Sequence, residues 1–142
     1  MYRKGAGWIL SILSAALAVA SAIVYLYNCK TPYFSTIGVS AFVVAMIAAG
    51  AVIQLAAVVL ARKGQKLWMD VLPVVASACL MAAAIRFLGI RINEIAFIMT
   101  FQKTAANLAD MRSAVIGIAL CGAALLVSWL ASFFDISVPA KE

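Results

Sequence analysis

The densest group of chemically active side chains lies between residues 86 and 112. Basic groups near a membrane interface bind phosphate or carboxylate groups. This stretch is therefore a candidate site for an anion, a lipid headgroup or a partner protein, and the simpler alternative is a solvated surface beside lipid headgroups. We call its charged residues the 86–112 cluster: Arg86, Arg91, Glu94, Lys103, Asp110 and Arg112.

Catalysis finds little support in the chain. It has no histidine, which removes the commonest general base and metal ligand. No HExxH, GxSxG, GxGxxG or P-loop pattern occurs. Glu94 and Asp110 are a conceivable acid–base pair, but 16 residues and an expected loop separate them. We therefore expect no enzyme, no catalytic or metal-binding residues and no cofactor.

The three cysteines are far apart and form no CxxC motif. Cys79 and Cys121 lie inside apolar stretches, where cysteine behaves as a small hydrophobic residue. Cys29 lies at the edge of an apolar stretch, so a reactive or intermolecular thiol is an alternative there.

Four apolar stretches must position these side chains. The chain is 67% hydrophobic and 11% charged, whereas about a quarter of the residues in soluble domains are charged. About 20 apolar residues suffice for a helix to cross a ~30 Å hydrocarbon core. The sequence therefore predicts a single all-α domain, residues 1–142, forming a four-helix transmembrane bundle with spans at about 8–27, 38–61, 67–88 and 113–134.

The first stretch also resembles a signal peptide, since Arg3 and Lys4 precede an apolar run that contains small residues. The apolar run continues to Tyr27, which favours a membrane span. Asp70 and Pro73 suit the first turns of the third span, and Arg86 suits its last turn. Gly89 is a typical residue to close that helix.

The segment 90–112 differs from the spans because charged and apolar residues alternate along it. Ile92, Ile95 and Met99 recur at helical spacing, which predicts an amphipathic interfacial helix followed by a loop. Arg91 and Glu94 stand three residues apart and are expected to pair on its surface. A re-entrant segment is the alternative.

Gln54 is a strongly polar residue deep in the second span. A buried amide in a membrane usually bonds to another helix, and a pore or substrate contact is the alternative. None of the five acidic residues lies at mid-span, which disfavours an ion-coupled transporter. Small residues four apart predict close helix packing, or alternatively a homo-oligomer interface: Ser14, Ala18 and Ala22; Ala41, Ala45 and Ala49; Ser113, Gly117 and Cys121.

The distribution of basic residues gives only a weak indication of how the protein is oriented in the membrane. Four spans place both termini on one side, and the chain carries a net charge of +6. The Lys and Arg residues divide six to five between the two sides, and their concentration near the first hairpin favours N-in, C-in. The near balance also allows dual topology with antiparallel dimers. The N-terminal side has Arg3, Lys4, Arg62, Lys63, Lys66 and Lys141, and the other side has Lys30, Arg86, Arg91, Lys103 and Arg112.

These features favour a non-enzymatic accessory or scaffold subunit, or a self-assembling membrane protein. The alternative is a channel or transporter formed by homo-oligomerisation, and a lipid-binding or enzymatic module using the 86–112 cluster comes third. Expected partners are membrane lipids and a homo-oligomer or larger membrane complex. No nucleic acid is expected, because no stretch interleaves basic and aromatic residues. The alanine-rich spans and short basic N-terminus suggest a bacterial inner membrane.

Overall fold

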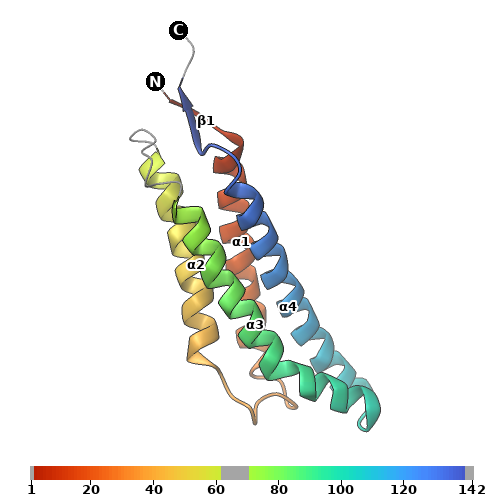
Figure 1. Cartoon of the computed structure of the whole chain (residues 1–142). Helices are drawn as coiled ribbons and strands as arrows, with labels where there is room; N and C mark the ends of the chain where they lie inside the picture. Colours follow the sequence, from red (N-terminus) through yellow and green to blue (C-terminus); the bar gives the residue numbers. More distant parts are fainter. Residues whose placement is uncertain (1, 62–70, 140–142) are drawn as a thin grey trace.

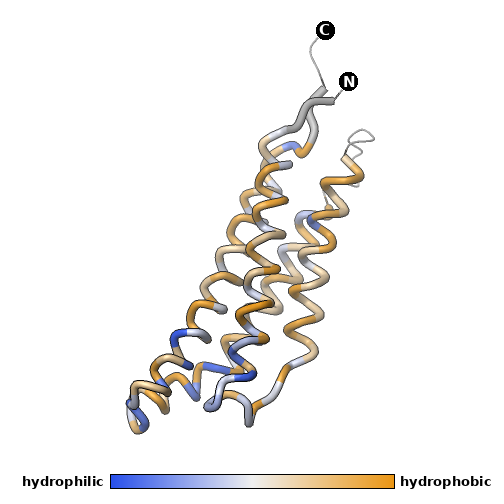
Figure 2. The backbone as a smooth tube through the Cα atoms, turned by 180° about the vertical axis from the view of Figure 1, so that it is seen from behind, coloured by the Kyte–Doolittle hydropathy of each residue, from blue (hydrophilic) through white to orange (hydrophobic). Residues whose placement is uncertain are grey.

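A computed structural model describes residues 2–61 and 71–139. Four helices form one elongated bundle (Figure 1). All four are long and apolar enough to cross a membrane, and apolar residues run along most of each helix (Figure 2). The predicted four-helix transmembrane bundle is therefore confirmed. Its helices are α1 (Ala6–Asn28), α2 (Ala41–Leu60), α3 (Val71–Thr100) and α4 (Ala105–Ala131).

The helices alternate in direction and form a closed ring, in which each helix packs against its neighbours in the chain and α4 returns to α1. The contact between α1 and α4 is the most extensive of all. The first apolar stretch is thus an integral part of the bundle.

Buried residues on α1 and α4 recur at alternating intervals of three and four, with Ala15 as an additional buried residue of α1. This average period of 3.5 is that of left-handed, coiled-coil-like packing. The stripes on α1 and α4 consist mostly of small residues, which let the two backbones approach closely. They are Gly7, Ser11, Ser14, Ala18, Ser21, Tyr25 and Asn28 on α1, and Ala114, Gly117, Cys121, Ala124, Ser128 and Ala131 on α4.

The helix end predicted at Gly89 is wrong, because α3 continues to Thr100. Its buried stripe runs on through Phe87, Arg91 and Ile98. Burial of these side chains stabilises the helical conformation beyond the glycine. A helix also keeps its backbone hydrogen bonds in an apolar medium. The segment 90–112, expected to be an interfacial helix and loop, is divided between the end of α3, a turn at 101–104 and the start of α4.

Helix α4 begins at Ala105, ahead of the predicted start at residue 113. Thr104 is its N-cap: the Thr104 hydroxyl accepts from the backbone N–H of Asn107 at 3.2 Å. The Asn107 side chain in turn donates to the carbonyl of Gln102 at 3.0 Å. A threonine in this position is a standard N-cap, so these two polar side chains start the helix.

The α3–α4 hairpin projects beyond the end of α1 and α2 (Figure 1). Helices α3 and α4 have 30 and 27 residues, against 23 and 20 in α1 and α2. At 1.5 Å per residue, α3 is about 45 Å long and α2 about 30 Å. Hydrophilic residues gather at this projecting end (Figure 2).

The two chain ends meet at the opposite end of the bundle. Strand β1 (Tyr2–Lys4) pairs antiparallel with β2 (Ser137–Pro139). The N–H of Gly5 donates to the carbonyl of Ile136 at 3.0 Å, which extends this pairing toward the helices. The basic residues Arg62, Lys63 and Lys66, together with Asp70 and the last residues, 140–142, lie outside the described residues.

Candidate functional site

Arg91 is the largest fully buried side chain in the described part of the chain. It belongs to the buried stripe of α3, at the level where α1 ends. Its Nη2 donates to the Cys29 Sγ at 3.0 Å. Its guanidinium carbon lies 4.6 Å from the centroid of the Phe34 ring and 5.8 Å from that of Tyr25. A cation is therefore enclosed by two aromatic rings and a sulfur atom.

The guanidinium of Arg91 has no carboxylate partner among residues 2–61 and 71–139. Its Nε and Nη1 are buried and make no hydrogen bond within these residues. Removing a charge from water without a partner costs several kcal/mol even after relaxation. Within the described residues, the hydrogen-bonding capacity of the Arg91 guanidinium is thus only partly satisfied.

The two nearby acids, Glu94 and Asp110, accept hydrogen bonds from Tyr33 in the connection between α1 and α2. The Tyr33 hydroxyl donates to Glu94 Oε2 at 3.1 Å, and the Tyr33 backbone N–H donates to Asp110 Oδ2 at 3.0 Å. The predicted pairing of Arg91 with Glu94 is therefore wrong. Arg91 lies on the buried stripe, whereas the carboxylate of Glu94 reaches the neighbouring connection.

We call residues 30–40 the cover segment, because its Phe34 is fully buried beside Arg91. The segment is held by the apolar contacts of Phe34 with Ile98 and Ala114 and by several polar bonds. In addition to the two bonds of Tyr33, the backbone N–H of Ser40 donates to the Tyr25 hydroxyl at 2.8 Å. At its start, the Thr31 hydroxyl donates to the carbonyl of Asn28 at 2.8 Å.

The environment of Tyr33 keeps its hydroxyl protonated. Desolvation raises the pKa of Tyr33, and the hydrogen bond and negative charge of Glu94 raise it further. The hydroxyl therefore remains a donor to Glu94 at neutral pH.

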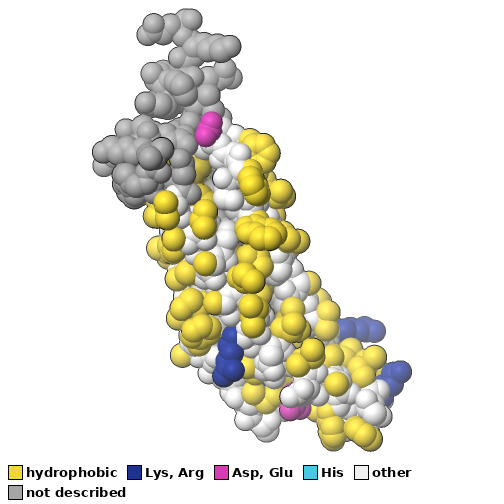
Figure 3. Space-filling model, in the orientation of Figure 1, with side chains coloured by type: hydrophobic (Ala, Val, Ile, Leu, Met, Phe, Trp, Pro, Cys, Tyr) yellow, Lys and Arg dark blue, Asp and Glu magenta, His cyan; other side chains and the backbone are white. Residues whose placement is uncertain are grey.

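The structure divides the 86–112 cluster. Arg91, Glu94 and Asp110 come together around the cover segment, whereas Arg86, Lys103 and Arg112 are exposed. Basic side chains lie near the projecting end of the space-filling surface (Figure 3). The cover segment supplies the partners that linear spacing did not indicate: Tyr33, Phe34 and the adjoining Cys29.

Gln54 belongs to a separate polar layer inside the bundle. Its side-chain amide donates to the Ser128 hydroxyl on α4. The Ser128 hydroxyl also lies 2.8 Å from that of Ser77, which donates to the carbonyl of Pro73. Three helices therefore share one buried hydrogen-bond network. The Ser11 hydroxyl and the Gln54 Oε1 are buried without a partner in the described residues.

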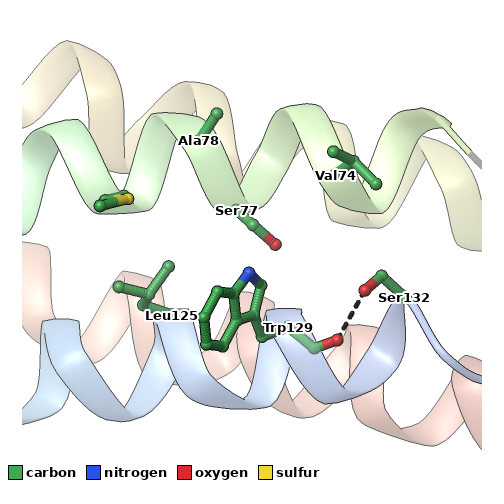
Figure 4. Close-up of a pocket in the computed structure, with 7 residues that line it drawn as sticks. Val74, Ser77, Ala78, Leu125, Trp129 and Ser132 are labelled. Atoms are coloured by element: carbon green, nitrogen blue, oxygen red, sulfur yellow. Dashed lines mark hydrogen bonds between the residues drawn. The ribbon is translucent and has the colours of Figure 1, made fainter.

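A pocket of about 220 Å³ opens on the side of the bundle between α3 and α4 (Figure 4). Its wall is mostly apolar, and the hydroxyl of Ser77 is already engaged within the polar layer. The pocket is lined by Val74, Ser77, Ala78, Met81, Leu125, Trp129 and Ser132.

The cysteines are free thiols; Cys29 and Cys121 are buried and Cys79 is partly buried. Across residues 2–61 and 71–139, no group of three or more histidine, cysteine, aspartate or glutamate side chains is placed to hold a metal ion.

These features define a class, a small multi-pass membrane protein built as a four-helix transmembrane bundle. Comparisons with protein-family models, with curated proteins and with solved structures find no match.

Proposed function

We propose that this chain is a non-catalytic assembly protein of the membrane, which binds another membrane protein or a second copy of itself. The observation that carries the proposal is the contrast between a filled interior and an exposed aromatic tip on the projecting α3–α4 hairpin.

The interior of the bundle is occupied by large side chains. Tyr25, Leu80 and Phe87 are fully buried, and Ile47 is almost so. The rings of Tyr25 and Phe87 meet edge to face with centroids 4.7 Å apart. Such packing favours a structural bundle over a pore through a single chain.

The tip of the hairpin presents apolar side chains without a covering partner in the described residues. Phe101 is 74% exposed, and Phe97 and Met99 are also exposed. The exposed basic residue Lys103 adjoins them. The cores of protein interfaces are enriched in aromatic side chains and methionine, so this hairpin supports docking to another protein.

The channel alternative loses support from the position of Gln54. A pathway made by several copies would run along outer faces of the bundle, whereas Gln54 is fully buried and bonded to Ser128. Gln54 therefore suits internal cohesion better than a pore lining.

The proposed location is a bacterial inner membrane with both termini inside. The pairing of β1 with β2 supports placing the two chain ends on one side, which would put the hairpin tip outside. Membrane lipids would surround the four helices in that arrangement.

The test compares phenylalanines at the two ends of the molecule. Phe101 and Phe133 are exposed by 74% and 79%, so they form a matched pair. The wild-type chain, Phe101→Ser and Phe133→Ser are cross-linked in native membranes and then sized in nanodiscs. We expect wild type and Phe133→Ser to give a larger species that Phe101→Ser loses. A wild-type chain that is always monomeric and captures no partner would refute the proposal.

A further inference from the structure

We propose that Arg91 is the receptor of a buried oxyanion site that takes a phosphate group beneath the cover segment. The ligand class is a phosphate oxyanion, either the phosphodiester of a membrane lipid or free phosphate. The proposal is independent of the assembly role.

The residues around the site carry a net positive charge, which favours binding of an anion. The cover segment and residues 86–112 hold five basic residues and two acids. Both acids already accept hydrogen bonds from Tyr33. Among the residues that the structure describes, Arg91 is the basic residue that is fully buried, and no carboxylate is paired with it there.

The donors of Arg91 match phosphate oxygens. Sulfur is a weak acceptor, so the bond from Nη2 to Cys29 satisfies little of the guanidinium. Nε and Nη1 remain as buried donors that no group in the described residues accepts from. The Phe34 face stabilises the cation but supplies no negative charge. A guanidinium binds phosphate strongly through charge-assisted hydrogen bonds.

The depth of the site suits a lipid phosphate. Arg91 contacts Cys29, which immediately follows the last residue of α1. The end of a membrane span lies near the lipid headgroups. Entry requires the cover segment to move, which breaks its polar bonds and withdraws Phe34 from its apolar contacts with Ile98 and Ala114, but no helix must unwind.

The first experiment measures thermal unfolding in a phosphate-free maltoside detergent. Three probes are added separately: inorganic phosphate, dihexanoyl phosphatidylglycerol, and dihexanoylglycerol, which lacks the phosphate. We expect the phosphate-bearing lipid to raise the unfolding midpoint of wild type by a few degrees and dihexanoylglycerol to leave it unchanged. A shift with inorganic phosphate as well indicates a site open to free phosphate. No shift with either phosphate probe overturns the proposal.

Matched variants locate the effect. Arg86→Gln removes an exposed arginine of the same helix and should retain the shift, whereas Arg91→Gln should abolish it. Equal shifts in the two variants would overturn the proposal. Arg91→Lys keeps the charge but loses the guanidinium fork, so its affinity should fall several-fold. This variant decides the question if Arg91→Gln does not fold, and an unchanged affinity in it counts against the guanidinium as receptor.

The sign of a stability change gives a second test. Without phosphate, Arg91→Met removes an uncompensated buried charge and should unfold at a higher temperature than wild type. With saturating dihexanoyl phosphatidylglycerol, wild type should become the more stable of the two. A variant less stable than wild type in both conditions would show that the chain alone satisfies Arg91.

Discussion

Close approach between helices depends on single glycines whose surroundings differ sharply. A Cβ on Gly117 would lie 2.9 Å from Cζ of Phe87, and one on Gly50 would lie 2.8 Å from Cγ of Leu80. A Cβ on Gly122, on the same helix as Gly117, would meet nothing within 4 Å. Gly122 can therefore serve as the control for adding a methyl group at Gly117.

Gly117→Ala should destabilise the bundle by about 1–3 kcal/mol, because the buried ring of Phe87 must move. Gly122→Ala should change the free energy of unfolding by less than about 1 kcal/mol, the scale of helix propensity alone. Unfolding of both variants by SDS in mixed micelles measures the difference. Similar losses in the two would mean that α4 does not pack as described.

Sequence spacing identified some of these contact residues and misassigned others. Gly117 and Cys121 are buried as expected of a packing stripe, whereas Ala41 and Ala45 are exposed. Spacing of four alone drifts around a straight helix, and only the alternation of three and four stays on one face of a supercoiled pair. Alanine-rich spans offer many spacings of four, so the sequence could not separate inner from outer stripes.

At the scale of elements, α1 and α4 are joined by a ladder of hydrogen bonds with a heptad period. Ser14 donates to the carbonyl of Ala124 at 2.8 Å, and Ser21 donates to that of Gly117 at 3.0 Å. Asn28 donates to the carbonyl of Asp110 at 3.1 Å. Successive donors and successive acceptors are each seven residues apart, so the ladder sets the antiparallel register of this pair.

Ser14→Ala and Ser21→Ala should each lower the free energy of unfolding by about 0.5–1 kcal/mol. The two sites are about 10 Å apart along the helix, so their effects should add in the double variant. Ser132→Ala is the control, because the Ser132 hydroxyl donates to the carbonyl of Trp129 in its own turn and not to another helix. An SDS titration of the four proteins tests additivity, and a silent double variant would exclude the ladder as a source of stability.

The boundaries of α3 and α4 were harder to predict than their existence. Gly89 resembles a helix end only when local residue preference is considered alone. Burial of Phe87, Arg91 and Ile98 on one stripe overrides it. A buried arginine also violates the expectation that charged residues lie on the polar face, so periodicity assigned this segment to an interface. The cover segment that encloses Arg91 comes from another part of the chain, which spacing cannot reveal.

Tyr33→Phe should loosen the cover segment, because it removes the hydroxyl that donates to Glu94. Cys29 is 5% exposed beneath this segment and reports its opening. We expect alkylation of Cys29 by a small maleimide to become several-fold faster in this variant. Tyr27→Phe, at an exposed tyrosine of α1, should label like wild type. The rate is measured by mass spectrometry in a Cys79→Ala, Cys121→Ala background, and an unchanged rate would show that the hydroxyl does not hold the cover.

At the scale of the whole molecule, the two ends of the bundle have different characters. One end joins the chain termini through β1 and β2. The other carries the cover segment, the buried Arg91 and the projecting hairpin. The Lys and Arg residues divide six to five between the two ends, so their distribution does not decide the orientation. The long hairpin and the paired termini are the positions at which the orientation can be measured.

Membrane orientation is best tested with single cysteines in a background without Cys29, Cys79 and Cys121. One cysteine replaces Lys103 at the hairpin tip, and another is appended after Glu142. With the termini inside, an impermeant maleimide should label Lys103→Cys in intact cells and the appended cysteine only after permeabilisation. The inverse pattern would reverse the orientation. Partial labelling of both in intact cells would instead establish dual topology, in which antiparallel copies place an aromatic hairpin tip on each side of the membrane.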